Sequence, residues 1–332
     1  MSTERQLALV TGGNGFIGSH LVEALLKRGY RVRCLVRKTS NLQWLKGLQV
    51  EYVYGDITVA SSLPDAVDGV DYVYHLAGAV EARDDEAFFT VNVQGTRNLL
   101  QACVDGSSPL KRFVLASSQS ASGPCEEAAC MDESDIPHPI SPYGRSNLKA
   151  EGVVLSYADR VPVTIIRPPA VYGPRDTMIL AYFKAVQMGI KPLLGLTHRK
   201  YISLVYVCDL IDGFLQAAES GNTIGEVYFI GDEKVYSRAE ILDGIATALS
   251  VRAVRIHVPD MAVHLLVKLS PFIKLIAPSS AGLSSGKAAE LVQKYWLCDV
   301  SKARRDFGFE TKVGLQEGLK MTAEWYKKQG WL

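Results

Sequence analysis

The sequence predicts an α/β fold with a doubly wound parallel sheet, and three observations support this. Short apolar runs that fit buried strands alternate with segments whose apolar residues recur at helical spacing. The first run, residues 7–10, leads directly into a glycine-rich turn and then into a helical pattern. The alternation continues to about residue 170 and then becomes irregular. We therefore expect helices on both faces of a parallel sheet, followed by a smaller, mostly helical part.

The composition is that of a soluble globular protein. The 332 residues are 48% hydrophobic and 21% charged, and 36 basic against 35 acidic side chains give a formal net charge of +1. This balance provides no global attraction to nucleic acid or to an anionic membrane, so we expect no nucleic-acid partner. The polar start MSTERQ runs straight into the first strand, so we expect no signal peptide.

The cysteines and an apolar stretch near the C-terminus further indicate the class of protein. The six cysteines are scattered, and the nearest two, Cys125 and Cys130, lack the spacing of a metal site. We interpret them as reduced thiols of a cytoplasmic protein that binds no metal. The most apolar late stretch, residues 261–283, is interrupted by prolines, lysines and a histidine. We expect packing helices or a lid there, and no membrane-spanning segment.

The glycine-rich turn is the first candidate site. Residues 13–18 form a GxGxxG pattern between a predicted strand and a predicted helix. The free N–H groups and positive dipole end of such a helix bind a pyrophosphate. We assign Gly13 to the tight turn, Gly15 to the close approach of phosphate and Gly18 to helix packing on the strand. A purely structural turn is the alternative. The predicted cofactor-binding residues here are Gly12, Gly13, Asn14, Gly15, Phe16, Ile17 and Gly18.

The end of the second predicted strand, residues 31–36, indicates which dinucleotide binds. About twenty residues past the fingerprint, a dinucleotide site usually has an acidic residue that binds the adenosine ribose. This chain has Arg37 and Lys38 there, and both could pair with a ribose 2′-phosphate. We therefore expect NADP in preference to NAD, with a solvated basic loop as the alternative.

Further predicted strands at residues 50–54, 71–76 and 113–116 end in small or polar residues. The carboxyl ends of parallel strands border the ligand crevice of a doubly wound sheet, although ordinary loop chemistry is an alternative. A helix over residues 88–100 lies between the last two strands. The remaining residues that we expect at the cofactor are Asp56, Ile57, Leu76, Ala77, Gly78, Asn92, Ser117, Tyr143, Asn147, Pro168 and Val171.

Ser118 and Tyr143 are the candidate reactive groups. Ser118 follows the strand at residues 113–116, and Tyr143 opens a helical pattern that runs to about residue 159. A phenol near a nicotinamide can exchange the proton that accompanies hydride transfer, and a serine hydroxyl can hold the substrate oxygen. A tyrosine that acts as a base near pH 7 needs a cation to lower its pKa, and on a helix that cation belongs four residues later.

At these positions the sequence resembles the extended short-chain dehydrogenase/reductase family, also called the NAD-dependent epimerase/dehydratase family. The resemblance covers nearly the whole chain and rests on TGGNGFIG at 11–18, HLAG at 75–78, NVQGTRNLL at 92–100, SPYGRSN at 141–147, RPPAVYGP at 167–174 and YVCDL at 206–210. It implies a Rossmann fold, an NAD(P) cofactor, a catalytic serine at Ser118 and a catalytic tyrosine at Tyr143. It also implies a homodimer that pairs the helices near residues 88–103 and after Tyr143.

Asn147 departs from the family's pattern. The family's YxxxK lysine, which holds the nicotinamide ribose and lowers the tyrosine pKa, falls on this position. An amide can bond to a ribose but carries no charge. Lys149 lies on another face of the helix. Either the activity is impaired, or another cation such as Arg145 or Arg175 replaces the lysine, or the sequence carries a substitution here.

A second departure concerns the substrate. Nucleotide-sugar members read RYFNVYGP, and here Ala170 replaces the asparagine associated with the diphosphate. The arginine that those members carry before a later strand has an apolar counterpart near Ile202. The motif looks closer to the 3β-hydroxysteroid dehydrogenase and dihydroflavonol reductase branches. We therefore expect an NAD(P)-dependent oxidoreductase acting on a secondary alcohol or ketone of an apolar, steroid- or flavonoid-like small molecule. The alternatives are a nucleotide-sugar epimerase or dehydratase, and a catalytically weak NAD(P)-binding structural or regulatory protein.

The irregular pattern after residue 170 suggests that the chain is divided into a dinucleotide-binding domain and a substrate-binding part. Residues 1–170 are expected to form the dinucleotide-binding domain, with residues 204–232 returning to it. Residues 171–203 and 233–332 are expected to form the substrate-binding part. Within the first of these segments the sequence predicts a helix over about 177–188 and a Gly/Pro-rich loop over 189–195.

Overall fold

A seven-stranded parallel sheet forms the centre of the computed structural model, which describes residues 5–106, 108–195, 200–261 and 285–332. The strand order is β10-β6-β5-β4-β1-β2-β3, and every neighbouring pair is parallel. The strands are β1 (Leu7–Thr11), β2 (Arg31–Val36), β3 (Glu51–Tyr54), β4 (Tyr72–His75), β5 (Arg112–Ala116), β6 (Val163–Arg167) and β10 (Glu226–Phe229). The predicted fold class is confirmed.

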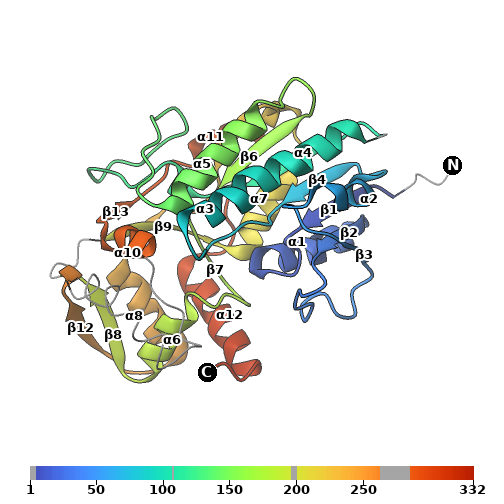
Figure 1. The fold of residues 1–332 in the computed structure, drawn as a ribbon. Coiled ribbons are helices and arrows are strands. Elements are labelled where there is room, and N and C mark those ends of the chain that lie inside the picture. The colour runs from blue at the N-terminus through green and yellow to red at the C-terminus, as the bar shows by residue number, and fades with distance from the viewer. Residues whose placement is uncertain (1–4, 107, 196–199, 262–284) are drawn as a thin grey trace.

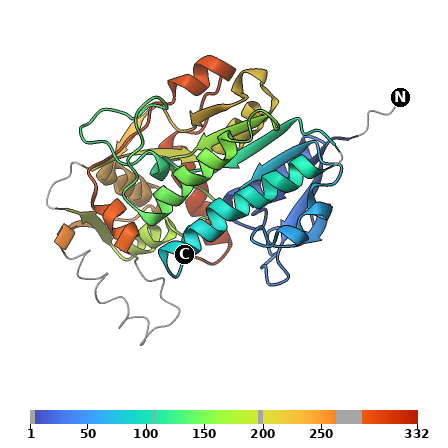
Figure 2. The ribbon, with the colours of Figure 1, turned by 45° about the horizontal axis from the view of Figure 1, so that its top comes forward.

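Helices cover both faces of this sheet. The face with α1 and α7 buries side chains such as Leu21 and Phe214, and the face with α2, α4 and α5 buries Leu99 and Val154. Figure 2 shows α4 and α5 crossing the second face side by side. The helices are α1 (Phe16–Lys27), α2 (Pro64–Val67), α3 (Asp85–Phe88), α4 (Gly95–Asp105), α5 (Pro142–Leu155) and α7 (Val207–Glu219), and a π-helical segment (Phe89–Gln94) joins α3 to α4.

The order of the strands reverses between β1 and β4. Strands β2 and β3 follow β1 in the chain and lie on one side of it in the sheet. Strands β4, β5 and β6 come later in the chain and lie on the other side. In open α/β sheets the ligand crevice lies at the carboxyl ends of the strands at such a point. The glycine-rich turn follows β1, and residues 76–78 follow β4. The fold therefore brings these two predicted cofactor segments to the same place.

A smaller part is assembled from the late segments. One sheet contains β7, β9, β11 and β13, and β8 pairs with β12 in a separate parallel pair. Helices α6, α8 and α12 enclose a core that includes Phe183, Leu319 and Tyr326. Figure 1 shows α6, α8, β8 and β12 grouped away from β1, β2 and β3. The bounds are β7 (Ala170–Tyr172), α6 (Leu180–Gln187), β8 (Ile190–Leu194), β9 (Tyr201–Tyr206), β11 (Val235–Ser237), α8 (Arg238–Leu249), β12 (Val254–Val258), α10 (Ser285–Val292), β13 (Tyr295–Trp296), α11 (Ser301–Phe307) and α12 (Leu315–Lys328).

The smaller part contains more strand than the sequence predicts. Residues 189–195 were predicted as a loop from their glycines and proline, whereas β8 occupies 190–194 because it pairs with β12. The flanking Gly189 and Gly195 take positive φ values of +86° and +91°, so these glycines bound the strand and do not interrupt it. Within residues 204–232, α7 and β10 lie with the main sheet, but β9 pairs with β7 and β11 in the smaller sheet.

Other features bear on the class of protein. No helix in the described ranges is long and apolar enough to cross a membrane. The apolar stretch 261–283 lies outside the described residues except for Met261, which is exposed. All six cysteines are free thiols. Among the side chains that the structure describes, no group of histidine, cysteine and acidic residues could hold a metal ion.

Candidate active site

The glycine-rich turn packs tightly against the end of β4. Gly12 has a φ of +70°, and a Cβ there would lie 2.8 Å from the Ala77 nitrogen. A Cβ at Gly18 would lie 2.1 Å from the Gly12 oxygen, so the start of α1 packs closely against the turn itself. The positive φ at Gly12 is one that glycine adopts without strain, and the role of Gly13 in the tight turn stays a prediction.

The start of α1 fits the pyrophosphate of a dinucleotide. Gly15 is the N-cap residue, no side chain caps the helix, and no acidic residue lies in its first turn. A Cβ at Gly15 would contact the Gly12 oxygen at 3.3 Å and nothing else within 4 Å, so the space above this turn is open. Uncapped amide groups facing open space are suited to bind an anion.

Buried hydrogen bonds shape the sheet edge beside this turn. The Thr11 hydroxyl accepts a hydrogen bond from the Ala77 nitrogen at 3.1 Å and contacts His75 Nδ1 at 2.7 Å. Complete burial lowers the pKa of His75 to about 4, so this ring is neutral at pH 7. The amide group of Asn92 is shared between the Ala79 backbone and the Ser146 hydroxyl. These side chains organise the edge, and the cofactor contacts expected of Leu76, Ala77, Gly78 and Asn92 stay predictions.

Residues near the predicted adenosine end are placed as follows. Arg37 and Lys38 are exposed, and neither makes an ion pair with a residue that the structure describes. Asn14 donates to the Asn41 carbonyl at 3.3 Å, which holds the basic segment near the glycine-rich turn. Asp56 accepts hydrogen bonds from Thr58 through one carboxylate oxygen, and Ile57 is buried. Binding of a phosphate by either basic side chain stays a prediction.

Ser118, Tyr143 and Asn147 come together at the start of α5. The side chains of Ser118 and Asn147 both hydrogen-bond with the Tyr143 hydroxyl. Asn147 also donates to the Tyr143 carbonyl at 3.1 Å, and the Phe88 ring lies 6.2 Å from the tyrosine ring. Helix α5 begins here because Ser141 accepts a hydrogen bond from the Gly144 nitrogen. The spacing argument for residues 143 and 147 correctly placed both side chains on one face.

The electrostatic surroundings of Tyr143 differ from those that a base requires. Burial raises the pKa of Tyr143, hydrogen bonds from Ser118 and Asn147 oppose this increase, and the Glu290 carboxylate raises the pKa further. No described cation lowers this pKa. The tyrosine is therefore protonated at neutral pH.

Neither arginine that we considered as a replacement for the missing lysine fills that role. Arg145 is exposed and pairs with Asp85 at 3.5 Å. Arg175 pairs with Glu23 at 2.5 Å on α1. Its guanidinium carbon lies 5.1 Å from the centroid of the Trp44 ring. The Arg175 side chain therefore interacts with Glu23 and Trp44 and not with Tyr143. Lys149 is exposed on another face of α5, as the helical geometry predicted.

A buried ion pair that the sequence analysis missed lies beneath the site. Glu151 on α5 and Arg167 at the end of β6 are bonded at 2.6 Å and 2.9 Å. The Ser117 hydroxyl donates to Glu151 at 2.5 Å, and Arg167 donates to Ser122 at 2.9 Å. The signal was present in the sequence, because Glu151 lies four residues after Asn147 on the same helical face. The Ser117 side chain is thus committed to this network.

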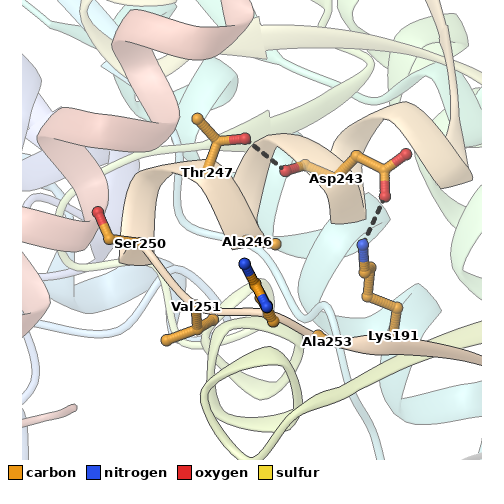
Figure 3. A pocket seen from close by; sticks show the side chains of 8 residues that line it. Lys191, Asp243, Ala246, Thr247, Ser250, Val251 and Ala253 are labelled. Carbon is orange, nitrogen blue, oxygen red and sulfur yellow. Dashed lines mark hydrogen bonds and ion pairs between the residues drawn. The ribbon is translucent and has the colours of Figure 1, made fainter.

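Figure 3 shows a surface hollow along the C-terminal half of α8. Asp243 pairs there with Lys191 at 2.8 Å and accepts a bond from the Thr247 hydroxyl at 3.0 Å through its carbonyl. None of the predicted site residues lines this hollow, so it is separate from the candidate active site.

The fold is that of a Rossmann-like protein, and Ser118, Tyr143 and Asn147 come together at the start of α5. Comparison with known proteins makes this specific. The chain belongs to the NAD dependent epimerase/dehydratase family, whose family model matches residues 8–231.

Relatives of known name differ in their substrates. A ceramide reductase of Caulobacter vibrioides is 31% identical, over 100% of this chain and 98% of its own length. A 3 beta-hydroxysteroid dehydrogenase/Delta 5→4-isomerase of Mycobacterium tuberculosis is 32% identical, over 98% of this chain and 92% of its own length. The solved structure of a UDP-glucose 4-epimerase from Thermotoga maritima superposes with a TM-score of 0.80 at 26% identity, covering 98% of this chain and 99% of that one. These findings confirm the family and the fold that the sequence predicted.

Proposed function

We propose that this chain is an NAD(P)-dependent oxidoreductase that interconverts a ketone and a secondary alcohol on a large apolar small molecule. The observation that carries the proposal is the Ser118–Tyr143 pair at the carboxyl edge of the sheet. The uncapped α1 N-terminus, at the same edge of the parallel sheet, supplies a place for the cofactor's pyrophosphate. When bound, the nicotinamide supplies or accepts the hydride.

The chain's own residues then handle the proton and the substrate oxygen. Ser118 holds the oxygen of the carbonyl or hydroxyl group by a hydrogen bond, and Tyr143 gives that oxygen a proton or takes one from it. Asn147 fixes the tyrosine by its bond to the Tyr143 carbonyl and can also reach a ribose hydroxyl. The Glu151–Arg167 pair holds α5 against β6, so the serine and tyrosine keep their relative positions.

The proposed substrate class rests on the groups that the sequence lacks and on the relatives. Ala170 and Ile202 stand where nucleotide-sugar members carry groups for a diphosphate, and an unpaired diphosphate would be costly to bury. Ceramide reductase and the 3 beta-hydroxysteroid dehydrogenase are named for lipids. Both facts favour an apolar substrate over a sugar nucleotide.

A second candidate is a catalytically weak NAD(P)-binding protein with a structural or regulatory role. The specific observation in its favour is that no described cation lowers the pKa of Tyr143. This candidate predicts cofactor binding without turnover.

The proposal extends to the cofactor, the assembly and the compartment. We propose NADP as the preferred cofactor, because Arg37 and Lys38 are exposed and free to pair with a 2′-phosphate. We propose a homodimer formed through the helices near residues 88–103 and α5, which follows from the family resemblance. The free cysteines support a cytoplasmic location. Gel filtration tests the dimer, and a monomer at working concentration would contradict it.

The experiment is a turnover screen with both cofactors in both directions. The panel contains steroids, sphingoid-type ketones, dihydroflavonols and UDP-glucose, with Tyr143→Phe as the control. We expect turnover of an apolar ketone or alcohol that Tyr143→Phe abolishes. Conversion of UDP-glucose alone would favour the epimerase alternative, and cofactor binding with no turnover would favour the weak-binding alternative.

A further inference from the structure

Glu290 links the smaller part of the molecule to the start of the catalytic helix. The Ser141 hydroxyl donates a hydrogen bond to Glu290 Oε1 at 2.6 Å. The same hydroxyl accepts a bond from the Gly144 nitrogen at 3.0 Å and so caps α5. Glu290 is buried, with 9% of its surface exposed. The Glu290 carboxylate is therefore held at Ser141, which precedes Tyr143 by two residues in the sequence.

The position of this carboxylate is set by the packing of α10. A Cβ at Gly286 would lie 2.9 Å from Pro142 Cδ, so the first turn of α10 lies directly against the start of α5. At the other end of the helix, the Trp296 indole donates to the Glu290 carbonyl at 2.9 Å. Figures 1 and 2 place α10 beside this end of α5. Both ends of α10 are thus anchored near Glu290.

The other charged groups around Tyr143 do not reverse the effect of this carboxylate. Lys287 Nζ is 3.9 Å from Glu290, but its side chain is 42% exposed and screened by solvent. Arg145 and Asp85 form an exposed pair whose charges oppose each other. Asn147, at the family's lysine position, is neutral. Burial raises the pKa of Tyr143 most, and the Glu290 carboxylate raises it further.

Resting on the proposed oxidoreductase function, we propose that Glu290 is a positioning residue that holds the start of α5 through Ser141 and opposes the loss of the Tyr143 proton, so that the resting site favours reduction of a carbonyl. The carbonyl carbon accepts a hydride from the reduced nicotinamide, and a C–H bond forms as the C=O π pair moves to oxygen. That oxygen takes the proton of Tyr143, and the O–H bond of the phenol breaks. The carbonyl is reduced, the nicotinamide is oxidised, and the phenolate regains a proton from water.

The pKa of Tyr143 supports this assignment, because both burial and the Glu290 charge raise it. With Tyr143 protonated over the whole neutral range, the reductive kcat is independent of pH there. Oxidation requires the phenolate, so the oxidative kcat rises about tenfold per pH unit below the Tyr143 pKa.

The test is the pH dependence of both directions in wild type and Glu290→Gln. Glutamine can still accept the Ser141 hydrogen bond but carries no charge. Both profiles have a midpoint at the pKa of Tyr143: above this pH, the reductive kcat declines and the oxidative kcat becomes constant. We expect this midpoint to be lower by about half a pH unit or more in Glu290→Gln. Glu324→Gln, which removes an exposed carboxylate on α12, should leave the profile unchanged. Ser141→Ala keeps the charge but loses the contact, so it should lower the melting temperature without moving the profile to lower pH.

An ultraviolet difference titration, with Tyr143→Phe subtracted, reads the same pKa without substrate. If no substrate is ever turned over, the proposed function fails, yet the titration still tests Glu290. An unchanged Tyr143 titration and pH profile in Glu290→Gln would overturn the inference. So would a wild-type oxidative kcat that is already independent of pH at pH 7.

Discussion

Asn147 donates its side-chain amide to the carbonyl of Tyr143, one helical turn earlier, at 3.1 Å. It also hydrogen-bonds with the tyrosine hydroxyl, so one neutral residue contacts both the backbone and the side chain of Tyr143. A hydrogen bond can orient the phenol, but it stabilises the phenolate less than a fixed positive charge does. The described residues therefore orient the Tyr143 hydroxyl, but none of them supplies a positive charge that would ionise it.

Asn147→Lys should supply that group. A lysine at this position lies on the same helical face as Tyr143, and we expect it to lower the tyrosine pKa by about one unit or more. The oxidative kcat at pH 7 should then rise about tenfold or more, and the gain should shrink as the pH approaches the unshifted tyrosine value. A pH–rate profile on any substrate found by the screen measures this, with Tyr143→Phe as the inactive control. An unchanged profile would show that some other group already activates Tyr143.

The sequence predicted the parts of this site that depend on short-range geometry. Strand, glycine turn and helix follow one another in the chain, and a spacing of four residues places Asn147 over Tyr143. The parts that it did not predict depend on contacts between distant segments. Glu290 reaches Ser141 across 149 residues, and no local pattern marks that contact.

One local error has a physical reason. The segment 189–195 contains turn-forming residues at both ends, but pairing with β12 decides its structure. A long-range contact outweighed a local preference here.

Gly15→Val should abolish cofactor binding and leave a folded protein. Gly15 has a φ of −83°, which any residue adopts, and its Cβ would contact only the Gly12 oxygen at 3.3 Å. The branched side chain would instead fill the space that the pyrophosphate needs. Gly314→Val is a matched control, because Gly314 caps α12 with a φ of −70° and open space around it. Fluorescence titration with reduced cofactor and circular dichroism measure the two effects, and normal binding by Gly15→Val would show that the turn is purely structural.

Arg37→Ala should weaken NADPH binding about tenfold or more and leave NADH binding unchanged. A charge-assisted hydrogen bond to a phosphate contributes about 1.5–3 kcal/mol, and only NADPH carries the 2′-phosphate. Arg252→Ala, at an exposed arginine of the smaller part, should change neither affinity. Titration of both reduced cofactors tests this. Tighter binding of NADH than NADPH by wild type, or an equal loss for both cofactors, would contradict the NADP assignment.

Glu151→Gln should destabilise the fold strongly, because it leaves the buried Arg167 guanidinium without its counter-charge. The pair is bonded at 2.6 Å, and its side chains are only 3% and 5% exposed. Removing one partner of a buried pair costs about 3–5 kcal/mol, whereas an exposed pair contributes less than about 1 kcal/mol. Asp85→Asn is the exposed control, since Asp85 pairs with Arg145 at 3.5 Å and is 67% exposed.

Urea denaturation measures the free energy of unfolding of both variants. The double variant Glu151→Gln with Arg167→Met removes the unpaired charge as well, so it should recover part of the stability that the single variant loses. If the single and double variants are equally unstable, the decrease in the free energy of unfolding comes from the lost hydrogen bonds to Ser117 and Ser122 and not from the unpaired charge of Arg167. If Glu151→Gln is as stable as Asp85→Asn, the buried pair does not hold α5 on β6, and another contact must keep Ser118 and Tyr143 in place.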